Sequence, residues 1–243
     1  MRVLALDTTT RDGSVALVEG DRVVAERRGD SSRTHAERLP QDLLALLDAE
    51  GVKLADVGIF AVASGPGSFT GLRIGIATIQ GLAFVQRRPI VAVSALEALA
   101  HAGSRGQQEG RLVGSWMDAQ RGEVFASLYR VAPGPLFGTE RLTEVRAPVV
   151  RDPAGVLTEW EAALAEEPVL IIGDGAARYE AVIRSRQPQA QVAAPPTLAG
   201  TIGLMAVPRA AAGGALDAAS VRPLYVRRPD AEIDRDRKAA IER

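Results

Sequence analysis

Residues 3–17 read VLALDTTTRDGSVAL, and residues 114–128 read GSWMDAQRGEVFASL. Each stretch holds a short apolar strand that ends in an aspartate, a tight turn with a glycine, and a second strand. This recurrence predicts a chain of two similar halves with a cleft between them. One aspartate, Asp7 or Asp118, then lies at the end of the first strand of each half.

The residues that follow the first hairpin predict one more strand and then alternating helices and strands. Further strands are expected at 22–27, 58–63 and 89–93, and helices at about 35–50, 70–86 and 94–102. Pro40 falls beyond the first turn of its helix, where it removes a backbone donor, so we expect a kink or a later start. The order β-β-β-α-β-α-β predicts an α/β fold with a mixed sheet and helices packed on it.

The second half repeats this order after a linker-like segment at 103–110. Beyond its opening hairpin, elements are expected as a strand within 137–149, a helix at 153–165, a strand at 169–172 and a helix at 175–186. We therefore divide the chain into a first lobe, 1–103, and a second lobe, 104–226, whose last helix can pack back on the first. Residues 227–243 read as a charged tail.

Composition excludes several classes of protein. The 243 residues include no cysteine, so disulfides, thiolate nucleophiles and Cys-ligated metals are excluded, and a reducing compartment, the cytoplasm, is expected. Lys plus Arg is 29 against 30 Asp plus Glu, so no global basic field attracts nucleic acid. Because no apolar stretch reaches about 18 residues and no leader pattern opens the chain, neither secretion nor membrane insertion is expected.

The strongest local motif is SGPGSFTGLRIG at residues 64–75, between a buried strand and a helix. A glycine-rich turn at a helix N-terminus exposes backbone donors and can bind phosphate or carboxylate. The motif matches neither the Walker A loop nor the Rossmann fingerprint. The other interpretation is a tight turn with Ser68 or Thr70 as the helix N-cap.

Candidate cofactor-binding residues lie at the strand ends. Asp7, Thr8 and Thr9 place a carboxylate and hydroxyls where a kinase-like fold would hold magnesium and phosphate, and Asp118 takes the same place in the second half. Asp174 could meet a nucleoside. From the residues alone we favour the other interpretation, in which they end a hairpin strand or cap the following helix.

The two histidines do not suggest a metal site. His35 and His101 lie far apart and form no paired motif, so no two-histidine metal centre is expected, and each is predicted on a helix surface. No Gly-x-Ser-x-Gly elbow is present, which argues against a serine hydrolase.

The helix at 70–86 is apolar almost all round. It is either a central helix of the monomer or a helix with one side on its sheet and the other on a second chain, and small residues favour close approach of a partner helix. We take the second interpretation. The candidate interface residues are Leu39, Leu43, Gly71, Leu72, Arg73, Gly75, Ile76 and Ile79.

Taken together, several segments resemble the TsaB (YeaZ) family, the bacterial dimerisation subunit of the machinery that puts threonylcarbamoyl on the adenosine beside the anticodon of certain tRNAs. The string GPGSFTGLR at 65–73 is the most specific of them. The others are residues 4–9, 14–17, 93–100, 117–124 and 223–227, all in the family's order. One departure is a missing residue between His35 and Pro40, so the path of the chain there is open.

The resemblance implies a duplicated fold like that of actin, sugar kinases and Hsp70 (ASKHA). It also implies a catalytically silent paralogue of the catalytic subunit TsaD, whose metal site is built partly on paired histidines. Such a chain would pair with TsaD, help recruit the ATPase TsaE, contact tRNA through the complex and form a homodimer when alone. It would have no cofactor of its own, because its partners handle ATP and metal, and Asp7, Thr8, Thr9, Asp118 and Asp174 would be vestigial. The alternative is a self-contained enzyme: a nucleotide hydrolase using Asp7, Thr8 and Asp118, or a glycopeptidase-like protease.

Overall fold

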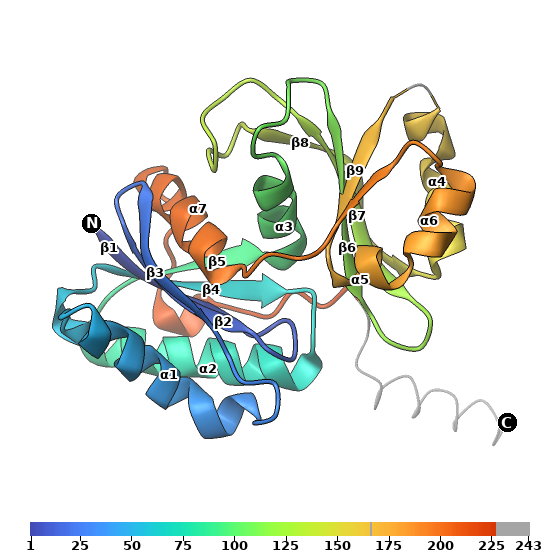
Figure 1. The fold of residues 1–243 in the computed structure, drawn as a ribbon. Coiled ribbons are helices and arrows are strands. Elements are labelled where there is room, and N and C mark those ends of the chain that lie inside the picture. Colours follow the sequence, from blue (N-terminus) through green and yellow to red (C-terminus); the bar gives the residue numbers. More distant parts are fainter. Residues whose placement is uncertain (166, 227–243) are drawn as a thin grey trace, which may run out of the picture.

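The structure, a computed structural model, describes residues 1–165 and 167–226, so the charged tail predicted at 227–243 lies outside the described residues. The chain forms two lobes side by side, each built on a five-stranded mixed sheet (Figure 1). The first sheet has the order β3-β2-β1-β4-β5 and the second β8-β7-β6-β9-β10. Because order and direction are the same in both, the predicted ASKHA-like duplication is confirmed.

Corresponding strands share their pairing. In the first lobe β1 (Arg2–Asp7), β2 (Ser14–Glu19) and β3 (Arg22–Arg28) are antiparallel, and β4 (Ile59–Gly65) and β5 (Ile90–Ser94) extend the sheet in parallel from β1. In the second lobe β6 (Leu112–Asp118), β7 (Val124–Val131) and β8 (Leu142–Arg151) are antiparallel, and β9 (Val169–Ile172) and β10 (Gln191–Ala193) run parallel to β6. The first strand of each lobe is therefore central, and its end is held at the middle of the molecule.

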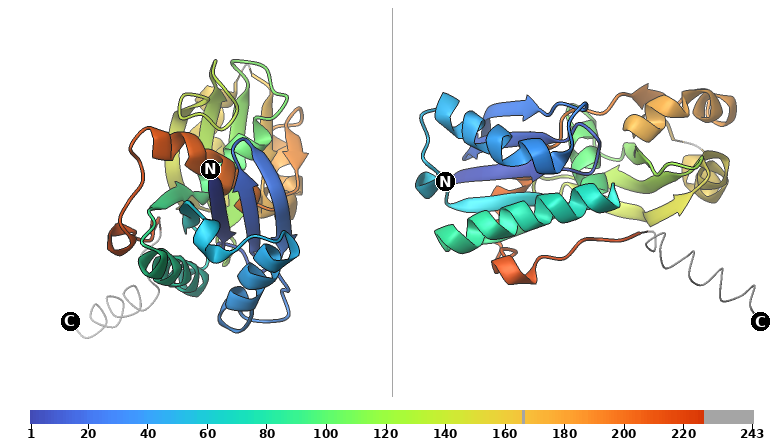
Figure 2. Two further views of the ribbon diagram at one scale, coloured as in Figure 1. Left: turned by 90° about the vertical axis from the view of Figure 1, so that its left-hand side faces the viewer. Right: turned by 90° about the horizontal axis from the view of Figure 1, so that it is seen from below.

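Two helices cover one face of the first sheet: α1 (His35–Ala49) and α2 (Phe69–Gln86). They run next to each other across this face (Figure 2). Thr34 and Glu37 form the capping box of α1, which begins at His35 although Pro40 lies inside the helix. Of the two expected effects of Pro40, a kink or a later start, the later start is therefore wrong. The Ser68 hydroxyl accepts a hydrogen bond from Gly71 N at 3.2 Å, which confirms Ser68 as the N-cap of α2.

The other face of the first sheet packs on α3 (Ala95–Gly103) and α7 (Ala199–Ala211), which lie between the two sheets (Figure 1). Their apolar residues join both sheets in one continuous core. The N-terminus of α7 is bound by the first lobe, since Ala199 N donates to Ser14 Oγ at 3.0 Å and Gly200 N to Glu26 Oε1 at 2.8 Å. The last helix thus packs on the first lobe.

The outer face of the second sheet is covered by α4 (Pro153–Leu164), α5 (Asp174–Arg178) and α6 (Glu180–Arg186). Trp116 and Trp160 meet edge to face in this core, with ring centroids 6.0 Å apart. The helix expected at 175–186 is two short helices, because the backbone leaves the helical region at Tyr179. No helix among the described residues is long and apolar enough to cross a membrane.

The segment after α7 forms a C-terminal strap (residues 214–226) that returns along α2 to the middle of the molecule (Figure 2). It contains the 3-10 turn Ala218–Ser220; a second 3-10 turn, Leu54–Asp56, precedes β4. The strap pairs Leu216 with Ile90, accepts hydrogen bonds from Gln80 Nε2 at Ala218 O and Val221 O, and donates from Leu224 N to Ser64 O at 2.7 Å. These contacts hold it on α2, β4 and β5.

Both histidines are buried, which corrects their predicted place on helix surfaces. His101 is 1% exposed on α3, and burial lowers its pKa to about 4. The ring nitrogen His35 Nδ1 lies 3.0 Å from Arg38 Nη2, and His35 Nε2 lies 3.0 Å from Thr10 O. With the proton on Nε2, His35 accepts from Arg38 and donates to Thr10, and so ties the start of α1 to the turn after β1.

Candidate functional site

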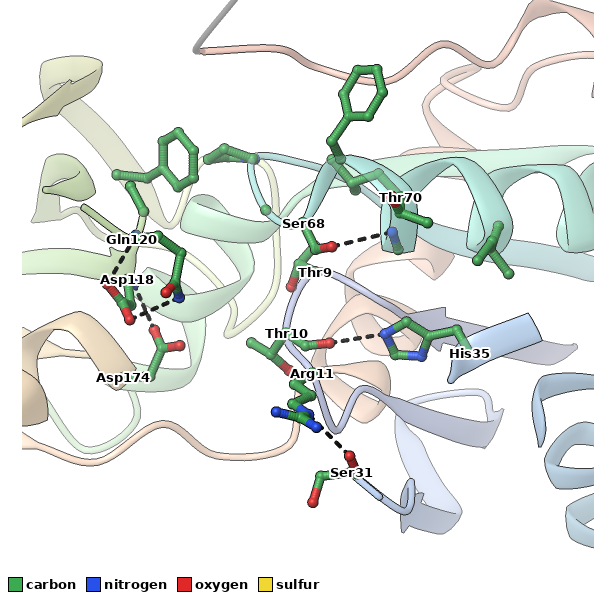
Figure 3. A pocket seen from close by; sticks show the side chains of 18 of the residues that line it. Thr9, Thr10, Arg11, Ser31, His35, Ser68, Thr70, Asp118, Gln120 and Asp174 are labelled. Atoms are coloured by element: carbon green, nitrogen blue, oxygen red, sulfur yellow. Dashed lines mark hydrogen bonds between the residues drawn. The ribbon is translucent and has the colours of Figure 1, made fainter. Parts of the chain in front are cut away.

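A cleft of about 710 Å³ opens between the lobes, where the ends of β1 and β6 face each other (Figure 3). Strand order explains its position, because the first strand is central in each sheet and the turns that follow both strands meet at the middle. Its walls come from segments far apart in sequence, chiefly Thr9–Arg11, Ser31–His35, Pro66–Leu72, Asp118–Arg121 and Leu224–Val226.

In the first lobe, Asp7 is 3% exposed and lines a smaller pocket of about 240 Å³, which shares Thr10, Arg11 and Asp174 with the cleft. Its Oδ1 atom accepts hydrogen bonds from the backbone N of Thr9 at 2.9 Å and from Thr9 Oγ1 at 2.6 Å. Burial raises the pKa of Asp7 above its usual range, although the bonds from Thr9 oppose the shift. The carboxyl is therefore held by its own turn and desolvated.

In the second lobe, Asp118 and Asp174 lie next to each other and are both held by hydrogen bonds (Figure 3). Asp174 Oδ1 accepts from Asp118 N at 3.0 Å and from Gly175 N at 2.9 Å, and burial raises the pKa of Asp174. Asp118 Oδ2 accepts from Arg178 Nη1 at 3.0 Å and from Gln120 Nε2 at 3.0 Å. Asp174 thus joins the strand end to α5 through its side chain, and Asp118 is neutralised by an arginine.

The structure brings together four of the five candidate cofactor-binding residues. Asp7 and Asp174 are close enough that the charge of Asp174 raises the cost of charging Asp7, and Asp118 and Thr9 lie beside them. Thr8 is fully buried under α2 instead, and its hydroxyl has no hydrogen-bond partner. Within residues 1–165 and 167–226, no three His, Asp or Glu side chains are placed to hold a metal ion.

The glycine-rich motif packs directly on the turn after β1. Ser68 N donates to Thr9 O at 3.0 Å, and a Cβ added to Gly67 would lie 2.6 Å from Thr9 Cβ. A Cβ on Gly71 would overlap Thr8 O, and one on Gly75 would overlap Thr8 Oγ1. The three glycines, four residues apart, form the strip that lets α2 approach β1. The structure therefore agrees with the tight-turn interpretation of the motif.

The glycine-rich motif fills the space directly beside the Asp7–Thr9 turn. In addition, the hydrogen-bonding positions of Asp7 Oδ1 and Asp174 Oδ1 are already taken by the chain itself.

Seven of the eight candidate interface residues are buried inside the monomer. Only Arg73 is exposed, while the other seven face the chain's own sheet, α1 or Thr8. These seven are Leu39, Leu43, Gly71, Leu72, Gly75, Ile76 and Ile79. The predicted set therefore names the inner side of the helix pair and not a surface that a second chain can reach.

The outer side of α2 is a different stripe, which we call the α2 face: Phe69, Arg73, Ala77, Gly81, Phe84 and Val85. Phe84 is 78% and Val85 74% exposed, and Leu44 on the adjoining α1 is 53% exposed. Nothing lies within 4 Å of a Cβ added to Gly81. Large apolar side chains next to small residues on an exposed helix are typical of a helix-packing surface.

Sequence reasoning missed the loop residues that complete the cleft. Arg11, Arg33 and Tyr225 carry no motif and come from three separate segments. They meet only because Arg38 and His35 hold α1 against the 10–13 turn and because the strap returns to the cleft.

A family model described as "TsaD: tRNA N6-adenosine threonylcarbamoyltransferase" matches residues 28–151. The chain is 33% identical over 185 residues to the tRNA threonylcarbamoyladenosine biosynthesis protein TsaB of Bacillus subtilis, covering 75% of each chain. It is 34% identical to the TsaB protein of Escherichia coli, covering 72% of this chain and 80% of that one. The chain belongs to the TsaB (YeaZ) family. A solved structure from Pseudomonas aeruginosa, described as similar to the peptidase YEAZ, superposes with a TM-score of 0.75 at 33% identity, covering 93% of this chain and 99% of that one.

The fold of this TsaB-family chain extends to sugar kinases. An inorganic polyphosphate/ATP-glucomannokinase from Arthrobacter superposes with a TM-score of 0.50 at 11% identity, covering 86% of this chain and 99% of that one. At that identity the likeness concerns the ASKHA-like architecture alone.

For this TsaB-family chain, Asp7→Asn should raise the free energy of unfolding at pH 7. The folded-state pKa of Asp7 is raised, so charging this group opposes folding at pH values above it, and that penalty disappears as the pH falls through the folded pKa. Asparagine Oδ1 can keep both hydrogen bonds from Thr9. Urea denaturation at pH 7 and pH 4 should show a gain that shrinks at the lower pH. Asp48→Asn on exposed α1 is the control, and a loss of stability at pH 7 would contradict the expectation.

Proposed function

We propose that this TsaB-family chain is a non-catalytic subunit of the cytoplasmic machinery for tRNA threonylcarbamoyladenosine synthesis. In this role it pairs with a TsaD-like catalytic subunit and helps recruit a TsaE-like ATPase, while tRNA is bound by the complex. The names of the relatives support the pathway. The observation that carries the subunit role is the α2 face, a mainly apolar stripe left exposed on an otherwise well-packed lobe.

The proposal assigns the α2 face, with Leu44 of α1, to the partner helices. One side of α2 already covers its own sheet, and the opposite side presents Phe84 and Val85 around Ala77 and Gly81. A homodimer would use the same face, because a two-fold interface needs only a self-complementary surface. Homodimer and heterodimer would then compete for it.

The absence of a catalytic role is supported by the cleft. The glycine-rich motif fills the space beside Thr8 and Thr9, and Asp118 is paired with Arg178. The sequence has only two lysines, Lys53 and Lys238, and neither lies in the motif. ATP and metal chemistry are therefore assigned to the partner subunits, and the cleft aspartates are assigned a structural role.

The test is reconstitution of threonylcarbamoyl transfer with purified TsaD-like and TsaE-like subunits, ATP, an activated threonylcarbamoyl donor and tRNA. Omitting this chain should abolish modification, and this chain alone should neither modify tRNA nor turn over ATP. Asp7→Asn should leave modification within a few fold, a change of less than about 1 kcal/mol in the barrier. ATP turnover by the pure chain that Asp7→Asn abolishes would instead establish the enzyme alternative.

A further inference from the structure

Arg73 is the one charged residue among the six that make up the α2 face. The other five are apolar or small, so the guanidinium group lies within a surface that the proposed function assigns to a partner helix. Burying an arginine in such a contact removes its charge from water, and this costs free energy unless an anion of the partner compensates it. The chemistry of Arg73 therefore restricts which helix can bind here.

The guanidinium group of Arg73 is oriented by two aromatic side chains. Its Cζ atom lies 3.9 Å from the centre of the Phe69 ring, and Nε donates a hydrogen bond to the Tyr225 hydroxyl at 3.1 Å. The two rings also contact each other, with centroids 5.3 Å apart. Because Arg73 is already held in place, it loses little conformational freedom when a partner binds it.

Tyr225 is itself held by the C-terminal strap. The preceding residue, Leu224, donates from its backbone N to Ser64 O at 2.7 Å. A Cβ added to Gly65 would lie 2.7 Å from Leu224 O, so the glycine lets the strap lie directly on the end of β4. The anchored strap thus fixes the hydroxyl that orients Arg73, and Tyr225 acts as a positioning residue.

The two Nη atoms of Arg73 donate to no residue within 1–165 and 167–226, and no carboxylate in these ranges forms an ion pair with it. The strap carries one acid and one base, Asp217 and Arg222, so its described part adds no net charge beside α2. The free Nη atoms form a fork, which we call the Arg73 fork, and its geometry matches the two oxygens of a carboxylate.

The acidic residues of α1 do not supply this carboxylate within the monomer. Glu37 is bound in the capping box, and Asp42 forms an ion pair within α1. Asp48 and Glu50 lie at the C-terminal end of α1. Since α1 and α2 both begin beside the cleft, this end is the one farther from Arg73.

We propose that the α2 face binds a partner helix that presents a carboxylate to the Arg73 fork, and that this pair selects the TsaD-like partner over a second copy of this chain. In a homodimer, the α2 face of the second copy brings a second Arg73 and no carboxylate. Each cation is then desolvated without a charge partner from that face. This inference rests on the proposed function and adds the chemistry by which its partner surface distinguishes two occupants.

The test replaces Arg73 by methionine, which can keep the contact with the Phe69 ring but has neither charge nor donors. The complex with a TsaD-like subunit should weaken at least about 30-fold, because the partner's carboxylate is left buried and unpaired. The homodimer should become at least about threefold tighter, because two unpaired cations leave an apolar contact. Fluorescence anisotropy of the labelled chain, kept below the homodimer dissociation constant, measures the complex, and analytical ultracentrifugation of the chain alone measures the homodimer.

Two further variants isolate the Arg73 fork. Arg22→Met removes an exposed arginine of β3 with the same change in net charge, and it should change neither affinity by more than about twofold. Tyr225→Phe removes the hydroxyl that orients Arg73, so it should weaken the complex about two- to fivefold in the wild-type chain and leave it unchanged in the Arg73→Met chain. Circular dichroism and urea denaturation show whether each variant is folded.

A folded Arg73→Met variant whose complex is unchanged or tighter would overturn the proposal, since no partner carboxylate would have lost its cation. A weaker Arg73→Met homodimer would overturn it as well. Equal weakening of that homodimer by Asp48→Asn/Glu50→Gln would then identify the second copy as the source of the carboxylate.

The outcome is separable from that of the proposed function. If Phe84→Asp disrupts the complex and reconstituted modification needs this chain, but Arg73→Met changes neither, the carboxylate is wrong and the subunit role stands. If the wild-type chain forms no complex with the TsaD-like subunit, the proposed function fails and this inference fails with it.

Discussion

Phe84→Asp should abolish partner binding by this chain and leave its fold intact. The side chain is 78% exposed in the monomer, so its loss removes little from the core. In an interface that buries the α2 face, the substitution removes about 2 kcal/mol of apolar burial and places an unpaired carboxylate in a desolvated contact. Together these effects should weaken both the homodimer and the complex with a TsaD-like subunit by more than about 100-fold.

Light scattering, circular dichroism and pull-down with the TsaD-like subunit measure these effects. The matched control is Leu136→Asp, which places the same charge at an exposed leucine of the second lobe, 42% exposed. It should dimerise and bind as the wild type does. A folded Phe84→Asp variant with wild-type dimerisation and partner recovery would show that the partner surface lies elsewhere.

Replacing each of two glycines of α2 by alanine should change the free energy of unfolding in opposite directions. A Cβ on Gly75 would overlap Thr8 Oγ1 within a fully buried contact, so Gly75→Ala should lower the free energy of unfolding by about 2 kcal/mol or more, as overpacking does. Gly81 faces open space, so Gly81→Ala should raise it by about 0.5 to 1 kcal/mol through helix propensity. Urea denaturation of the two variants measures both changes.

A double-mutant cycle identifies the cause. Thr8→Ala removes a buried hydroxyl that has no hydrogen-bond partner, so alone it should change stability little. Combined with Gly75→Ala it should recover most of the lost stability, because the overlapping atoms are gone. Equal stability of the Gly75→Ala and Gly81→Ala variants would show that α2 does not depend on this close approach.

The same variants distinguish the residues of α2 that are needed for folding from those that are proposed to bind a partner. Gly75 was taken from the sequence as an interface residue, yet any side chain there disturbs the packing of α2 on β1. A substitution at Gly75 therefore tests folding, whereas one at Gly81 or Phe84 tests binding. The small residues of α2 serve two different contacts on two sides of the same helix.

Most of the fold follows from local sequence signals. Alternating strands, the Asp12-Gly13 turn and the capping box at Thr34 and Glu37 are short-range features, and they predicted the hairpins and the start of α1 closely. The repeated hairpin predicted a cleft between the strand ends, because a duplicated topology brings equivalent strand ends together; Asp118 lines this cleft, whereas Asp7 lines a smaller pocket next to it. Asp174 joined them as a candidate from its place after an apolar strand.

Other features depend on contacts between distant segments. His35 and His101 read as surface residues, but Arg38 and the packing of α3 between the sheets bury them. The cleft residues Arg11, Arg33 and Tyr225 share no sequence motif. They come from three segments that are separate in the chain and meet only in the folded protein.

The sequence by itself determined the family, the two like lobes, the order of strands and helices and the apolar character of α2. Each of these is encoded in residue types and in spacing along the chain. Tertiary structure alone decided which side of α2 is inside, because a helix that is apolar all round has no polar side to mark the one that faces solvent. The close approach of the Thr8–Thr9 turn settles the matter: Gly67, Gly71 and Gly75 lack the Cβ atoms that would collide with it, so this side turns inward and leaves Phe84 and Val85 to solvent.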